Sequence, residues 1–76
     1  MRNILIIGAG RSASSLIKYL LDKSVSENLH LTIGDLSLEL AQRKTKNHPN
    51  ATAIQLDIAN IAQRQAEIQK ADIVIS

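Results

Sequence analysis

Two patterns of apolar residues alternate along the chain. Short continuous apolar runs predict strands, and apolar residues spaced three and four apart predict helices. The continuous apolar run at residues 4–7 is typical of a buried parallel strand. After it, apolar residues recur at spacings of three and four, which places them on one face of a helix. The residues of this predicted face are Ala13, Leu16, Ile17, Leu20 and Leu21.

The same alternation continues to the end of the chain. The pattern predicts strands at 29–33, 52–56 and 72–76, the first of them closed by Gly34 and Asp35. Ser37 is a suitable N-cap for a helix that runs to about residue 46, before a breaker at 47–50. Asn60 and Gln63 resemble a capping box that opens a third helix, with an apolar face of Ile61, Ala62, Ala66 and Ile68.

The order of elements is β-α-β-α-β-α-β. Short links between alternating strands and helices imply right-handed crossovers, and therefore an α/β fold with a parallel sheet. We predict a Rossmann-like, doubly wound sheet with strand order 3-2-1-4. Because such domains usually have six strands, we expect residues 1–76 to be the N-terminal part of a truncated domain. The substrate and catalytic domain would be absent, and a homodimer would cover the exposed sheet edge.

A glycine-rich turn lies between the first predicted strand and the first predicted helix. It has the form G-x-G-x-x-A and consists of Gly8, Ala9, Gly10, Arg11, Ser12 and Ala13. In this context, glycines permit a tight turn and a close approach of the main chain to a pyrophosphate. The amides of Arg11, Ser12 and Ala13 are expected to face the anion at the positive end of the helix. The turn therefore predicts a dinucleotide site.

Asp35 ends the second predicted strand, close to the roughly 20-residue spacing expected for the acid that binds the ribose hydroxyls. Its carboxylate repels a 2′-phosphate, so it favours NAD as the cofactor, with NADP as the alternative. Leu36 follows Asp35 and belongs to the predicted cofactor site. Arg43 and Lys44 are nearby cations that would favour NADP, but their positions indicate exposed helix residues.

Two further residues follow predicted strands at the same edge of the sheet. Asp57 either accepts a hydrogen bond from the adenine amino group or caps the turn at 58–60. Ser76 ends the last strand beside the predicted crevice, where its backbone would pack on the ribose or pyrophosphate. No nucleophile or metal constellation is evident, so we predict no catalytic residue and no metal ligand in this chain.

Composition narrows the possible partners. The chain has 76 residues, a formal charge of +2, a single aromatic residue (Tyr19) and no cysteine. Nucleic-acid stacking platforms need aromatic residues, so nucleic acid is not an expected partner. No apolar stretch approaches the roughly 20 residues of a membrane span, and the N-terminal run is too short for a signal peptide. These features predict a cytoplasmic protein with no membrane association.

Four segments together resemble the N-terminal NAD(P)-binding region of the saccharopine dehydrogenase family. They are residues 4–11, the stretch 34–37 with Leu40 and Ala41, residues 56–58 and residues 71–76. The resemblance covers the whole chain and implies an oxidoreductase of amino-acid metabolism with an amino-acid substrate bound elsewhere. The implied reaction is reversible cleavage of saccharopine, or reductive condensation of an amine with a keto or aldehyde partner. By position, Gly8, Gly10, Arg11, Asp35 and Asp57 match cofactor-contacting sites of the family.

Two other functions are compatible with this pattern. The nucleotide-sensing regulatory domain of potassium transport systems also joins a glycine-rich turn to an acid after the second strand, and it is not an enzyme. A methyltransferase that binds S-adenosylmethionine has the same acid but typically a denser glycine loop. The dehydrogenase remains the leading hypothesis, and the chain alone is not expected to be a complete enzyme.

Overall fold

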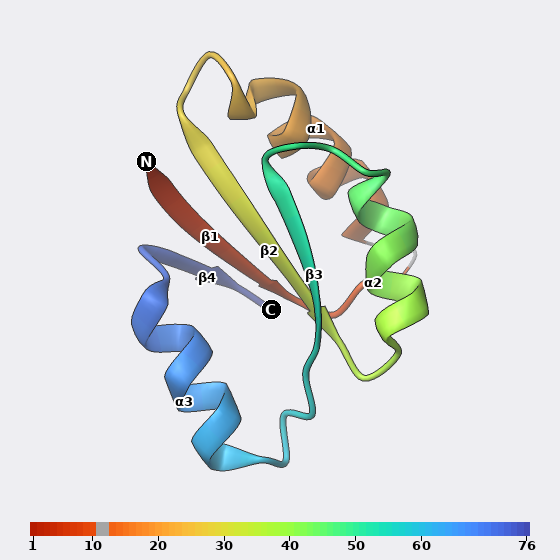
Figure 1. The fold of residues 1–76 in the computed structure, drawn as a ribbon, viewed down its shortest axis with the longest axis vertical. Coiled ribbons are helices and arrows are strands. Elements are labelled where there is room, and N and C mark those ends of the chain that lie inside the picture. Colours follow the sequence, from red (N-terminus) through yellow and green to blue (C-terminus); the bar gives the residue numbers. More distant parts are fainter. Residues whose placement is uncertain (11–12) are drawn as a thin grey trace.

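A parallel sheet of four strands in the order β3-β2-β1-β4 organises the fold (Figure 1). The structure is a computed structural model and describes residues 1–10 and 13–76. The strands are β1 (Arg2–Ile7), β2 (Leu29–Asp35), β3 (Ala51–Gln55) and β4 (Ile73–Ile75). The helices are α1 (Ser14–Ser24), α2 (Leu38–Thr45) and α3 (Ile61–Lys70). The predicted doubly wound α/β fold and its strand order are confirmed.

Strand β1 lies inside the sheet because it pairs on both sides. Ile6 stands opposite Ile33 of β2 and opposite Ile75 of β4, and both pairings are parallel. The carboxyl ends of β1 and β4 therefore lie side by side, at the point where the chain connections diverge to opposite faces of the sheet. In open α/β sheets this switch point is where ligands bind.

One face of the sheet carries the hydrophobic core. Helices α1 and α2 cover this face, and Ile17 and Leu21 of α1 pack against the aliphatic side chains of β1 and β2. Burying these side chains supplies the main favourable term in folding, since each contributes about 1.5–3 kcal/mol. The buried residues of the cluster are Ile4, Ile6, Ala9, Ile17, Leu21, Leu29, Leu31, Ile33 and Ala41.

The other face is covered by α3, which packs more loosely than α1 and α2. The helix forms where expected, but its predicted apolar face is not buried: Ile61 is 59% exposed and Ile68 is 38% exposed. No residue of α3 is buried, although the helix lies against β1 and lines a small hollow beside Leu5. The periodicity identified the helix correctly, and its apolar face is less buried than that of α1.

The N-caps of α2 and α3 were predicted from sequence and are present. Ser37 Oγ accepts a hydrogen bond from Leu40 N at 3.2 Å, and Asn60 Oδ1 accepts one from Gln63 N at 3.1 Å. The capping box is only half formed, because the Asn60 N–H donates to the Asp57 carbonyl at 2.9 Å and not to the side-chain oxygen of Gln63. The Gln63 side chain instead donates from Nε2 to the Gln55 carbonyl at 2.7 Å. Gln63 therefore ties α3 to the end of β3.

Candidate functional site

The glycine-rich turn leaves β1 through a backbone conformation that only glycine adopts readily. Gly8 has φ of +97°, in the left-handed region, and its N–H donates to the Gly34 carbonyl at 2.7 Å. An added Cβ at Gly8 would meet no atom within 4 Å, so the need for glycine comes from the backbone angle and not from crowding. Ala9, the next residue, is fully buried.

Gly10 exposes the main chain beside a cavity at the switch point. The residue is exposed, and among the residues that the structure describes, no atom outside its chain neighbours lies within 4 Å of the position that a Cβ would occupy. A cavity of about 210 Å³ adjoins it at the carboxyl ends of β1 and β4. Its lining residues are Ile6, Ile7, Gly8, Gly10, Ala13, Leu16, Ile75 and Ser76. The structure thus brings together the predicted residues Gly8, Gly10, Ala13 and Ser76.

Four of these lining residues were not predicted as site residues: Ile6, Ile7, Leu16 and Ile75. The sequence carried a signal for three of them, since they are the last residues of the two strands that flank the switch point. Leu16 is on the first turn of α1 and was assigned only to the apolar helix face. The cavity therefore has an apolar wall beside the open main chain of Gly10.

Helix α1 begins at Ser14, so that Ala13, expected in the first helical turn, is the residue before the helix. Ala13 precedes the helix, provides no side-chain cap, and donates its N–H to the Gly10 carbonyl at 3.0 Å. The Ala13 amide is therefore engaged within the turn, contrary to the expectation that it faces an anion. Arg11 and Ser12, the other two predicted amide donors, lie outside the described residues. In the described part, the amides of the first helical turn begin at Ser14.

Asp35 lies at the end of β2 and contacts two separate turns. Its Oδ2 accepts a hydrogen bond from Ala9 N, and its Oδ1 accepts one from Ser37 N, both at 2.8 Å. The side chain is half-buried next to the glycine-rich turn. Asp35 and the turn, predicted as two parts of one site, are therefore in direct contact.

Leu36 and Asp57 are at the same edge of the sheet but do not line the cavity. Leu36 is 66% exposed. Asp57 is also exposed, and its Oδ1 accepts a hydrogen bond from Ala59 N at 2.9 Å, while its carbonyl accepts one from Asn60 N. Of the two interpretations of Asp57, this contact matches the turn cap.

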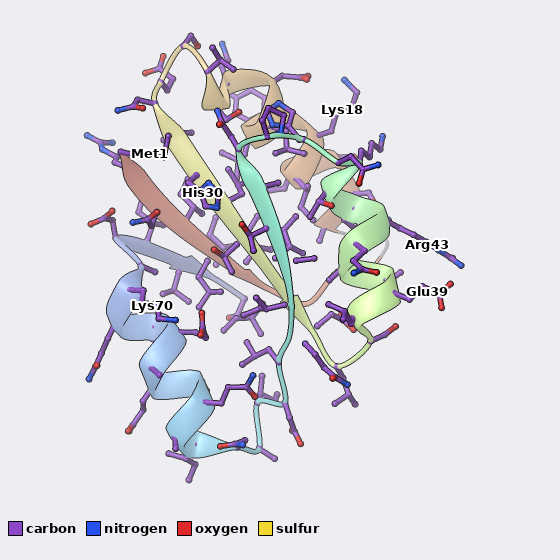
Figure 2. All side chains as sticks on the ribbon, viewed as in Figure 1. Met1, Lys18, His30, Glu39, Arg43 and Lys70 are labelled. Carbon is purple, nitrogen blue, oxygen red and sulfur yellow. The ribbon has the colours of Figure 1, made fainter. Side chains whose placement is uncertain are left out.

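The cations of α2 have different environments. Figure 2 shows Arg43 and Glu39 extending from α2 away from the sheet, where they form an exposed ion pair. Lys44 was expected to be exposed, but it is half-buried and donates to Ser14 Oγ at the start of α1. A hollow of about 450 Å³ between α1 and α2 is lined by Lys44 and Lys18, and none of the described residues of the glycine-rich turn lines it.

His30, within β2, has a structural partner. His30 Nε2 lies 2.8 Å from Thr52 Oγ1, a contact between β2 and β3. Among residues 1–10 and 13–76, no group of three histidine or acidic side chains is placed to hold a metal ion. In the same described part of the chain, no helix is long and apolar enough to cross a membrane.

Comparison with known families identifies the chain over almost its whole length. Residues 4–76 match the family described as Saccharopine dehydrogenase NADP binding domain. This match confirms the resemblance predicted from sequence, and with it a nicotinamide dinucleotide, NAD(P), as the cofactor class. A search of curated proteins finds no match.

Solved structures share the fold. Apo saccharopine dehydrogenase (L-Glu forming) from Saccharomyces cerevisiae matches with a TM-score of 0.83 at 24% identity, over 97% of this chain. The dTDP-glucose 4,6-dehydratase of Bacillus anthracis, solved in complex with NAD, matches with a TM-score of 0.71 at 22% identity, also over 97%. The chain spans 16% of the first protein and 26% of the second.

Proposed function

The chain belongs to the saccharopine dehydrogenase NADP binding domain family, and from this membership we propose that it binds NAD at the carboxyl edge of its sheet. Family membership makes it a dinucleotide-binding domain of an oxidoreductase. The proposal adds the site residues, the preference for NAD and the reaction class. We also propose that residues 1–76 form the first part of the cofactor domain and that other segments of a longer protein bind the substrate.

The observation that carries this proposal is the open main chain of Gly10 beside the cavity at the switch point. A diphosphate needs backbone N–H groups and a close approach without side chains in the way. Gly10 leaves that approach open, and the positive end of α1 adds a favourable field of about 0.3–1 kcal/mol per facing charge. Gly8, Gly10, Ala13 and Ser76 line this cavity, and Arg11 completes the motif in the sequence.

Asp35 supports NAD over NADP. Its half-buried carboxylate is at the position where the ribose of a bound dinucleotide is expected, and a carboxylate accepts hydrogen bonds from ribose hydroxyls. The same negative charge repels a 2′-phosphate. The complex of the similarly folded dehydratase with NAD supports this choice, although the family takes its name from NADP.

The proposed reaction is that implied by the family. It is the reversible oxidation of a C–N bond in an amino-acid derivative, or the reductive condensation of an amine with a keto or aldehyde partner. The nicotinamide ring would carry the hydride, and the apolar wall formed by Ile6, Ile75 and their neighbours would face the bound cofactor. We assign no catalytic residue within residues 1–76.

Titration with NADH and NADPH tests the proposal, with nicotinamide fluorescence as the readout. We expect a saturable change with NADH and at least roughly tenfold weaker binding of NADPH, the ratio that about 1.4 kcal/mol of repulsion produces. The substitution Gly10→Val should abolish the change, because its side chain would occupy the path of the diphosphate. Ala62→Val on exposed α3 adds bulk far from the motif and should leave binding unchanged.

Different results would contradict the binding of a cofactor at this site and the preference for NAD over NADP. No saturable signal with either nucleotide at millimolar concentration would contradict cofactor binding by this site. Saturable binding with a preference for NADPH would contradict only the role of Asp35 in cofactor choice. The binding of a nicotinamide dinucleotide at this site would still hold. Retained tight binding in Gly10→Val, with an unchanged circular dichroism spectrum, would place the cofactor elsewhere.

A further inference from the structure

Both carboxylate oxygens of Asp35 are engaged by the protein itself. One oxygen accepts from Ala9 N in the glycine-rich turn, 26 residues away in the chain, and the other accepts from Ser37 N before α2. The Asp35 carbonyl also accepts a hydrogen bond from Leu56 N after β3, at 2.9 Å. Asp35 therefore connects three loops that follow three different strands.

The contact with Ala9 has a specific physical consequence. Ala9 is fully buried, so its N–H would be an unpaired buried donor without the carboxylate, which is a costly arrangement. The positive φ of Gly8 precedes this amide, and the Gly8 N–H is held by the Gly34 carbonyl. Two hydrogen bonds thus attach the first half of the glycine-rich turn to the end of β2.

The engaged carboxylate still has acceptor capacity. An ionised carboxylate offers about four lone-pair sites, and the two backbone amides occupy one on each oxygen. Roughly one site per oxygen therefore remains for a donor from outside, which suits a ribose diol. The Ala9 amide, in contrast, is directed to Asp35 and is not free for a phosphate.

We propose that Asp35 is a positioning residue that fixes the glycine-rich turn in its cofactor-receiving form before the cofactor binds, besides any contact with ribose. The ligand-binding part of this inference rests on the proposed function. The carboxylate links the turn to the start of α2, so losing it would loosen the approach to the diphosphate even for a ligand that has no ribose hydroxyls. Diphosphate binding would then depend on a side chain that does not touch the diphosphate.

Asp72 provides a control at the opposite end of the strands from Asp35. Its Oδ2 accepts a hydrogen bond from Asn3 N at 2.8 Å, so it makes the same kind of long-range contact to a backbone amide. Asp72 precedes β4, whereas Asp35 ends β2, which puts the two carboxylates at opposite ends of the parallel sheet. Asp72→Ala therefore removes a long-range carboxylate–amide contact, in this case an exposed one, without touching the glycine-rich turn.

The binding experiment compares ADP with 2′,3′-dideoxy-ADP on the full chain by calorimetry. The dideoxy compound retains the diphosphate but cannot donate to Asp35. We expect Asp35→Ala to weaken binding of dideoxy-ADP about tenfold, the scale of losing a charge-assisted hydrogen bond, and Asp72→Ala to change it less than twofold. Asp35→Asn keeps one acceptor oxygen and should fall between wild type and Asp35→Ala. Equal binding of dideoxy-ADP by wild type and Asp35→Ala would overturn the proposal and leave Asp35 as a ribose contact only.

A second measurement needs no ligand and separates this inference from the proposed function. Amide hydrogen exchange in the nucleotide-free chain should be at least about tenfold faster at Ala9 and Ser37 in Asp35→Ala, which removes both acceptor oxygens, than in wild type. Asp72→Ala should leave both amides unchanged. If wild type binds no nucleotide but this exchange pattern appears, the positioning contact stands and the proposed function fails. Unchanged protection of Ala9 in Asp35→Ala would overturn the positioning role.

Discussion

The two faces of the sheet differ sharply in how well they are packed. On the face covered by α1 and α2, Leu31 and Ile33 are completely buried and Ile17 is nearly so. On the other face, α3 has no buried residue, and apolar side chains of α3 and β4 remain exposed. The same periodic pattern of apolar residues therefore produced two buried helix faces on one side and, on the other, a helix with no buried residue beside the buried side chain of Leu5.

The candidate site lies where these two regions meet. The glycine-rich turn and Asp35 belong to β1, β2 and α1, which the packed face holds together. The opposite wall of the cavity comes from Ile75 and Ser76, at the end of the three-residue strand β4. The turn is thus supported by the core, while the wall across from it depends on a short outer strand. The packed face therefore supports the proposed diphosphate position.

Truncating one isoleucine on each face should give the largest difference in the free energy of unfolding. Ile33→Ala removes a completely buried side chain and should lower the free energy of unfolding by about 2–5 kcal/mol. Ile68→Ala, on α3, should cost less than about 1 kcal/mol because its side chain is already partly hydrated. Urea denaturation followed by circular dichroism measures both.

Ile33→Val, with an expected cost of about 0.5–1.5 kcal/mol, is the variant to use where Ile33→Ala does not fold. Equal losses for the alanine variants at Ile33 and Ile68 would show that α3 is packed as tightly as the opposite face. The comparison between the faces would then no longer hold.

The two glycines of the turn should respond differently to alanine. Gly8→Ala forces a side chain into the left-handed region and should cost about 1–3 kcal/mol, with no steric contribution because the space is open. Gly10→Ala meets no atom and has no positive φ, so it should be neutral or stabilise by about 0.4–1 kcal/mol. Thermal unfolding of both variants checks this pair, and a loss at Gly10 equal to that at Gly8 would contradict the assigned backbone roles.

Removing the N-caps should change stability the least of these substitutions. It should also show whether the helices on the two faces unfold together with the sheet. Ser37→Ala removes the cap of α2 and should lower global stability by about 1 kcal/mol. Asn60→Ala removes the cap of α3. Because α3 is expected to open locally without global unfolding, this change should lower global stability less than Ser37→Ala does. Native-state hydrogen exchange would show faster exchange confined to α3 in Asn60→Ala. Exchange that accelerates equally throughout the sheet would indicate that α3 unfolds only with the rest.

Much of the fold and of the motif could be predicted from the sequence because the relevant signals are local. The apolar run at residues 4–7 and the N-caps Ser37 and Asn60 involve residues within a few positions of one another, and all are present in the structure. The need for glycine at position 8 is also local, since it depends on one backbone angle. The family resemblance added the cofactor class, which the family match confirmed.

Contacts between distant segments could not be predicted in the same way. Gln63 was expected to complete a capping box but reaches the end of β3, and Lys44 was expected in solvent but reaches the start of α1. In each case, several partners lie within reach of a long side chain, and the packing of two elements decides among them. Ala13 likewise gives its amide to Gly10, which the motif alone does not reveal.

For this protein, the sequence by itself determined the order of strands and helices, the glycine-rich turn and the acid at the end of the second strand. These depend on short-range periodicity and on backbone angles that one or two residues set. Only the tertiary structure decided that one helical layer is buried and the other is not, and that the carboxylate of Asp35 holds the Ala9 amide. Those outcomes depend on which surfaces meet in space, because burial and long-range hydrogen bonds are properties of assembled elements.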